Sequence, residues 1–157
     1  MKITRLAILA ASAISTFAQL PTQKVLTVDL AQTIAQEAMM KCRADGYKVS
    51  VTVVDHTNLL KAFLRDDGAP MATVEVGRMK TNTVMDFGRA SGPPANLPAG
   101  QPAPPPLLPG TINAMGGVPI KAGDQLVGAV SVSGAPGGDK DAACANAALA
   151  KVADKLK

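Results

Sequence analysis

Aromatic side chains are scarce in this sequence of 157 residues. It contains no tryptophan, one tyrosine and three phenylalanines, whereas proteins that stack the bases of nucleic acids need several aromatic rings. A large excess of positive or negative charge is lacking as well. Once Lys2 and Arg5 of the N-terminal stretch are set aside, basic residues outnumber acidic ones by only two, far from the basic surface that nucleic acids require. We therefore expect no nucleic-acid partner.

Long hydrophobic runs are absent too. The apolar stretch over residues 6–14 is shorter than the ~20 residues that span a bilayer, so we expect no membrane span. It follows two basic residues and precedes a small-x-small sequence at 16–18 (Thr-Phe-Ala), the pattern of a cleaved signal peptide. We predict a signal peptide over residues 1–18, with a buried N-terminal helix as the alternative. The mature chain, 19–157, is then periplasmic or secreted and has the length of one domain.

Cysteine is limited to Cys42 and Cys144. An exported chain meets oxidising conditions, which permit one disulfide between them, whereas two buried free thiols are the alternative. No further ligands cluster beside either cysteine, so we do not expect this pair to bind a metal ion.

The motifs of several large enzyme classes are missing. His56 is the only histidine, and there is neither a Gly-x-Ser-x-Gly nucleophile elbow nor a phosphate-binding loop. The sequence therefore gives little support to a Ser/His/Asp hydrolase or a nucleotide-phosphate site.

The patterns that are present predict an α+β domain. Apolar positions at helical spacing, bounded by capping residues or helix breakers, predict three helices, over residues 29–44, 72–87 and about 139–156. Period-two patterns rich in β-branched residues predict two hairpins, with strands over 48–54 and 59–65, then 118–121 and 125–133. This order favours an antiparallel sheet with helices packed on it. If the first and last helices lie antiparallel on one face, Cys42 meets Cys144, which favours the disulfide.

One segment has low complexity. Residues 89–111 hold eight of the twelve prolines, and proline fixes φ and removes a hydrogen-bond donor. We predict a long surface loop with polyproline character, which serves either as a lid or binding arm or as a plain connector.

Four motifs give the sequence a resemblance to a known family. They are VTVVD at 51–55, FLRDDGA at 63–69, GGVPI at 116–120 and GAVSVSG at 128–134. In this order they resemble the GlcG/HbpS family, over about residues 27–157. The resemblance implies a profilin-like domain, a five-stranded antiparallel sheet with flanking helices. It also implies a small-molecule ligand, with haem as the cofactor, and a homo-oligomer, because members of the family bind haem or assemble with themselves.

Two residues are candidates for the haem iron. His56 carries imidazole, the commonest biological haem ligand, although its predicted position in a tight turn between two strands also suits a solvated side chain. Met71 is the alternative axial ligand, because similar sequences place a histidine close to this point. We interpret Met79, Met85 and Met115 as fillers of the core or of an interface.

Two basic residues are candidates for a carboxylate of the ligand. Arg65 and Lys80 would pair with haem propionates or with another small acid. The alternative for Arg65 is a salt bridge to Asp66 or Asp67.

Four residues of the second hairpin complete the candidate site. Gly116 and Gly117 would let the backbone approach a ligand closely. Ser133 and Gly134 precede the last helix and would offer amide donors to an anion. Strand geometry alone also accounts for these glycines.

Three hypotheses for the function follow. The first is a secreted haem-binding or haem-handling protein, not an enzyme in the strict sense, with a shallow site at a subunit interface. The second is a binding protein or enzyme of the glycolate-use kind, which takes a small hydroxy acid near Arg65 and the glycine turns. The third is a structural module that forms oligomers.

Overall fold

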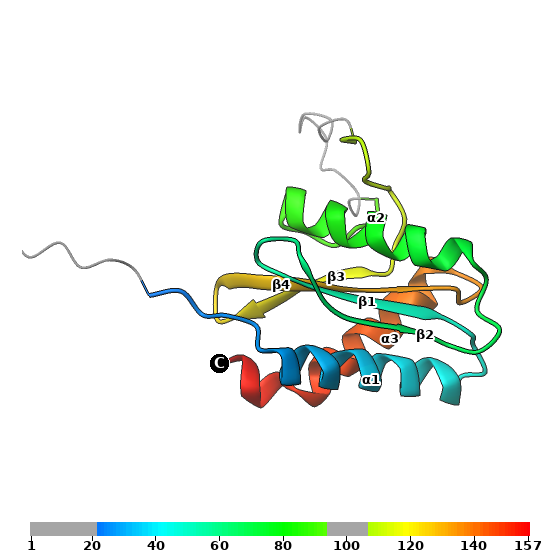
Figure 1. Ribbon diagram of the computed structural model, residues 1–157, viewed down its shortest axis with the longest axis horizontal. Helices are drawn as coiled ribbons and strands as arrows, with labels where there is room; N and C mark the ends of the chain where they lie inside the picture. Colours follow the sequence, from blue (N-terminus) through cyan, green and yellow to red (C-terminus); the bar gives the residue numbers. More distant parts are fainter. Residues whose placement is uncertain (1–21, 94–106) are drawn as a thin grey trace, which may run out of the picture.

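An antiparallel sheet lies at the centre of the computed structural model, between two layers of helices (Figure 1). The structure describes residues 22–93 and 107–157. The predicted signal peptide, residues 1–18, and most of the proline-rich loop lie outside the described residues, so the structure does not test them.

The sheet contains four strands: β1 (Ser50–Asp55), β2 (Leu60–Arg65), β3 (Gly117–Ala122) and β4 (Gln125–Ser133). Their order is β2-β1-β4-β3, and every neighbouring pair is antiparallel. The helices are α1 (Val28–Ala44), α2 (Ala72–Phe87) and α3 (Gly138–Lys151), followed by the 3-10 helix η1 (Ala153–Leu156). Within the described residues, no helix is both long and apolar enough to cross a membrane.

The sheet has four strands rather than the expected five, as far as the chain is described. Residues 107–116, which lead into β3, contact the rest of the protein through isolated hydrogen bonds instead of a ladder. One example is the bond of 2.9 Å from the Ile112 amide to Thr83 Oγ1. Pro109 removes one backbone donor from this described stretch.

Two helix boundaries also differ from expectation. Helix α1 begins at Val28 because Thr27, rather than Asp29, is its N-cap: Thr27 Oγ1 accepts a hydrogen bond from the Leu30 amide at 3.3 Å. Helix α3 ends at Lys151, and the chain continues as η1 instead of as one long helix.

The apolar core lies between the sheet and helices α1 and α3. The alternation predicted for β1 is confirmed: Val51 and Val53 belong to this core, together with buried alanines of both helices. Small side chains allow α1 and α3 to lie close together, and a disulfide joins Cys42 near the end of α1 to Cys144 near the start of α3, with 5.6 Å between their Cα atoms. A bond between the end of one helix and the start of the other is the one expected for helices that lie antiparallel.

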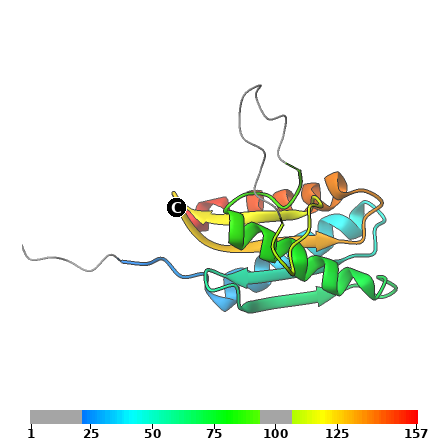
Figure 2. The same ribbon diagram turned by 90° about the horizontal axis from the view of Figure 1, so that it is seen from above.

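Helix α2 covers the opposite face of the sheet (Figures 1 and 2). This face combines a small apolar cluster of Val54, Val84 and Ala129 with several buried hydroxyl groups. Ser50 Oγ lies 2.7 Å from Thr73 Oγ1, and Ser131 Oγ donates a hydrogen bond of 2.7 Å to the Gly77 carbonyl. Gly77 allows this approach, because a Cβ at that position would lie 3.0 Å from Thr52 Oγ1. That buried hydroxyl has no hydrogen-bond partner in the described part of the chain. The α2 layer therefore depends more on polar contacts with the sheet than the layer of α1 and α3 does.

A buried carboxylate anchors the end of α1 to the segment after β2. Asp66, 2% exposed, accepts hydrogen bonds from Arg43 Nη2 at 2.9 Å and from Arg43 Nε at 3.1 Å. These bonds outweigh burial and hold the pKa of the Asp66 carboxyl below its ordinary value. The predicted alternative for Arg65, a salt bridge to Asp66 or Asp67, is not present: Arg65 donates to the Ala69 carbonyl.

Candidate functional site

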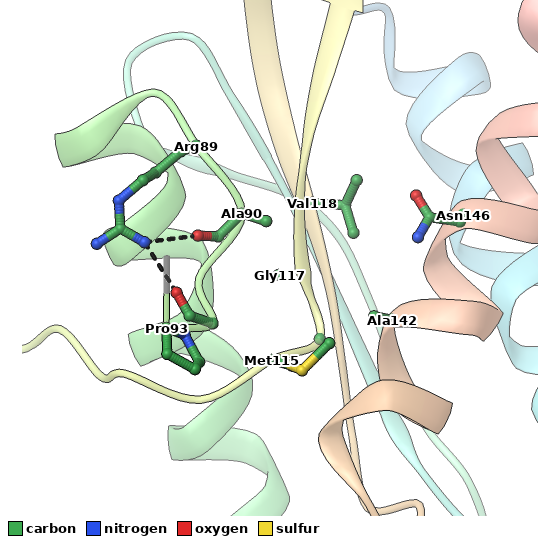
Figure 3. Close-up of a pocket in the computed structure, with 10 residues that line it drawn as sticks. Arg89, Ala90, Pro93, Met115, Gly117, Val118, Ala142 and Asn146 are labelled. Atoms are coloured by element: carbon green, nitrogen blue, oxygen red, sulfur yellow. Dashed lines mark hydrogen bonds between the residues drawn. The ribbon is translucent and has the colours of Figure 1, made fainter. Parts of the chain in front are cut away.

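A pocket of about 390 Å³ lies where the segment after α2 meets β3 and α3 (Figure 3). Its volume is in the range of ~300–1,000 Å³ that small-molecule sites occupy. Its walls are mainly apolar and include Ala90, Pro93, Val118 and Ala142. An apolar pocket with few polar groups is typical of a ligand site.

Three side chains give the pocket its chemistry: the guanidinium of Arg89, the thioether of Met115 and the amide of Asn146. Arg89 Nη1 donates to the carbonyls of Ala90 at 3.0 Å and Gly92 at 2.9 Å. In Figure 3, Met115 lies between Pro93 on one side and Ala142 on the other. The guanidinium also lies 5.4 Å from the centroid of the Phe87 ring. The pocket therefore offers one sulfur atom and a guanidinium whose Nη1 is already bonded, so an anionic group would have to pair with Nε or Nη2 of Arg89.

A buried ion pair lies behind the glycines of this pocket. Lys80 Nζ donates to Asp141 Oδ2 at 2.8 Å and to the Val132 carbonyl at 2.9 Å, and both charged residues are less than 5% exposed. Gly116 lies against this pair with φ +124°, and a Cβ there would lie 2.6 Å from Lys80 Nζ and 2.8 Å from Asp141 Cβ. The glycine is therefore required by the ion pair, whether or not a ligand is bound.

Asp141 also accepts hydrogen bonds from backbone amides that follow β4. Its Oδ1 accepts a hydrogen bond from the Ala135 amide at 2.9 Å. Burial raises the pKa of the Asp141 carboxyl, and the ammonium of Lys80 and the amides of Ala135 and Gly134 offset this rise only in part. The sequence predicted that amides near Ser133 and Gly134 would bind an anion of the ligand. In the structure these amides bond to the carboxylate of Asp141 instead.

Gly117 is fixed by a serine that sequence reasoning did not single out. Ser91 Oγ accepts a hydrogen bond from the Gly117 amide at 2.9 Å and donates one of 2.6 Å to the Ala114 carbonyl. The segment after α2 and the start of β3 therefore hold each other at the pocket.

The structure brings together some of the predicted site residues but not all of them. Lys80, Gly116 and Gly117 converge at the pocket or directly behind it, and Gly134 lies beside Asp141. Ser133, the last residue of β4, is buried opposite Ser50. Because Lys80 is paired with Asp141, it is not free to bind a propionate.

The other three candidates lie away from the pocket. Arg65 is occupied by the Ala69 carbonyl, and Met71 is 85% exposed at the start of α2. His56 lies in the turn between β1 and β2, at the end of the sheet opposite to Ser133. Its Nδ1 atom is buried without a partner in the described ranges, which also contain no group of three or more His, Cys, Asp or Glu side chains that could hold a metal ion.

Sequence reasoning missed Arg89 and Asn146 and interpreted Met115 as a filler, yet all three line the pocket. They come from three elements far apart in the chain, and no local pattern links them. Asp141 carried one signal, an acidic residue in the first turn of a helix, but helix capping accounts for that signal fully.

The chain matches one protein family and several solved structures. The family described as "Haem degrading protein HbpS-like" matches residues 26–150. The crystal structure of HbpS is similar with a TM-score of 0.65 at 26% identity, and the match covers 88% of this chain and 99% of HbpS. A search of curated proteins gives no significant match.

Two further structures support the fold alone, because their sequences are less similar. The Klebsiella pneumoniae protein ORFY has a TM-score of 0.67 at 22% identity, with 86% of this chain and 96% of ORFY covered. PduOC, solved as a haem complex, has a TM-score of 0.66 at 18% identity, with 81% of this chain and 94% of PduOC covered.

Proposed function

Because this chain belongs to the HbpS-like family of haem-degrading proteins, we propose that it binds or handles haem in the pocket between α3, β3 and the segment after α2. The observation that carries the proposal is the combination, in one pocket, of apolar walls with Arg89 and Met115. Neither the fold nor the family name by itself selects a site on the molecule.

The side chains of the pocket fit haem in three respects. Ala90, Pro93 and Val118 offer apolar contact to the macrocycle, and the guanidinium of Arg89 suits a propionate. The thioether of Met115 is a side-chain type that ligates haem iron in proteins. When bound, haem would supply an iron centre that takes up electrons and small ligands.

Titration of the mature protein with hemin, followed by the Soret band, tests the proposal. We expect a saturable shift with a fixed stoichiometry. Ala142→Leu, which fills the pocket from α3, should remove most of this binding, whereas Ala143→Leu places the same side chain on the exposed neighbouring position of α3 and should leave it unchanged. Unsaturable uptake by the unchanged protein, or equal binding by the two variants, would contradict the proposed site.

A second candidate ligand is a small hydroxy acid, favoured by the guanidinium of Arg89 in a pocket of modest volume. Binding of glycolate or lactate should raise the melting temperature of the unchanged protein, and Arg89→Gln should abolish the increase because it removes the cation that pairs with the carboxylate. An increase that survives in Arg89→Gln would place the acid elsewhere.

We further propose that the chain is exported and loses residues 1–18. The disulfide between Cys42 and Cys144 supports export, because such bonds persist mainly outside the reducing cytosol. Mass spectrometry of the protein from the periplasm or medium should give a chain that begins at Gln19. A chain recovered intact in the cytosol would contradict export.

We also propose a homo-oligomer. Strand β2 is an edge of the sheet, and large apolar side chains are exposed on it and in the turn before it, including Leu59, Leu60 and Phe63. Light scattering should give a mass above that of one chain, and Leu60→Glu should lower it. A monomer at the concentrations used for hemin binding would rule out a site that needs a second subunit.

A further inference from the structure

We propose that Met115 is the side chain that ligates the haem iron, through its sulfur atom. This inference rests on the proposed function and assigns a role to one residue of the same pocket. Met115 is 42% exposed, yet its backbone and the base of its side chain are enclosed by neighbouring segments. A residue held firmly at its base with an accessible tip is suited to bind a ligand.

Two glycines enclose Met115 from separate parts of the chain. Gly138 is the first residue of α3, and a Cβ there would lie 2.9 Å from both the Cβ and the carbonyl oxygen of Met115. Gly92 follows α2, and a Cβ at this position would collide with Met115 Cγ. Both contacts are closer than a Cβ tolerates, so any larger residue at either position must displace Met115 or its own segment.

The residue after Met115 is fixed as well. The Gly116 carbonyl accepts a hydrogen bond of 3.0 Å from the Val132 amide, and the ion pair of Lys80 and Asp141 fills the space beside it. The sheet, the ion pair and the two neighbouring glycines thus define where the side chain begins. Fixed ligands of this kind lower the entropic cost of binding.

Competing iron ligands lie elsewhere in the described residues. The imidazole of His56 is in the turn at the far end of the sheet, and the exposed Met71 is at the start of α2 outside the pocket. Among the residues that line the pocket, Met115 alone carries a side chain that is known as an axial haem ligand. A neutral thioether favours reduced iron and raises the reduction potential of haem.

Met115→Leu tests this assignment, because leucine keeps the volume and apolar character of methionine but has no sulfur. We expect the variant to bind hemin more weakly, to lose the absorption band of thioether-ligated ferric haem and to show a lower reduction potential. Met71→Leu makes the same chemical change outside the pocket and should match the unchanged protein in all three measurements.

Two more variants make the test independent of a loss of folding. Met115→His restores a ligating atom and should bind hemin with the spectrum of histidine-ligated haem in place of the thioether band. Gly92→Ala keeps the methionine but should shift the position of its sulfur, so we expect a weaker thioether band. Urea unfolding of the same variant shows whether the fold is retained.

The outcomes separate the two proposals. If the unchanged protein takes up hemin without saturation, haem binding itself is refuted. If it binds saturably and Met115→Leu has the same affinity, spectrum and potential, haem binding stands and the role of Met115 is refuted.

Discussion

Replacing Lys80 by methionine should cost about 3–5 kcal/mol of the free energy of unfolding, the range observed when one partner of a buried ion pair is removed. Lys80 and Asp141 are 3% and 4% exposed, and the ammonium is the only cation within hydrogen-bonding distance of that carboxylate among the described residues. Methionine fills much of the volume of the lysine side chain, so the loss of stability comes chiefly from the Asp141 carboxylate that is left buried without its ion-pair partner. Domains of this size are typically stable by about 5–15 kcal/mol, which leaves a folded state to measure.

A double-mutant cycle turns this prediction into a measurement of the pair. Asp141→Asn alone should also be strongly destabilising, because it leaves the ammonium buried, but its amide oxygen can still accept from Ala135. The double variant should be more stable than the sum of the two single losses predicts, with a coupling of about 2–3 kcal/mol in urea unfolding. The same cycle on the more exposed pair of Lys41, in the last turn of α1, and Asp45, the C-cap of that helix, should give about 0.5 kcal/mol or less. Losses at Lys80 and Asp141 that add within about 0.5 kcal/mol would refute the role of the ion pair.

Three further predictions concern stability. Replacing both Cys42 and Cys144 by alanine should cost about 4–5 kcal/mol, as expected for a closed loop of roughly 100 residues, and free-thiol titration of the unchanged, unfolded protein without reductant should detect no thiols. Because the pKa of the Asp66 carboxyl is lowered in the folded state, its contribution to the free energy of unfolding is present above about pH 4 and is lost as the pH falls below that value. In a plot of the urea midpoint against pH, Asp66→Asn should therefore reduce the loss of stability at acidic pH. An unchanged acidic slope would contradict this. Gly116→Ala should destabilise by more than about 2 kcal/mol, because φ is positive and the site is filled, whereas Gly46→Ala, with positive φ in open space, should cost only about 1–2 kcal/mol.

The sequence predicts the fold well where one interaction determines the pattern. The alternating valines of β1, including Val51 and Val53, face an apolar core, and burial on one face is enough to set that register. Two small-residue helices lying antiparallel favoured a bond between Cys42 and Cys144 over two free thiols, and the disulfide is present. The fifth strand is not confirmed within the described residues; it was expected from the resemblance alone, and no period-two segment of this sequence predicted it.

The candidate site is harder to predict, because its residues share no local pattern. Gly116 and Gly117 stand out in the sequence, but what they pack against, Lys80 and Ser91, is decided by tertiary contacts. Met115 looks the same in sequence as any methionine that fills a core. Its role depends on glycines that lie far from it along the chain.

The difference between the two faces of the sheet suggests how a ligand would affect the whole protein. Helices α1 and α3 are held by a large apolar core and a disulfide, whereas α2 contacts the sheet through a small apolar cluster and through hydroxyl groups. One of these hydroxyls, that of Thr52, has no hydrogen-bond partner among the described residues. Fewer apolar contacts make α2 the layer that should open at lower free energy. The pocket has one wall from the segment after α2 and another from α3, so a ligand in it contacts both layers. Because such a ligand binds only when both walls are in place, it stabilises the association of α2 with the rest of the domain.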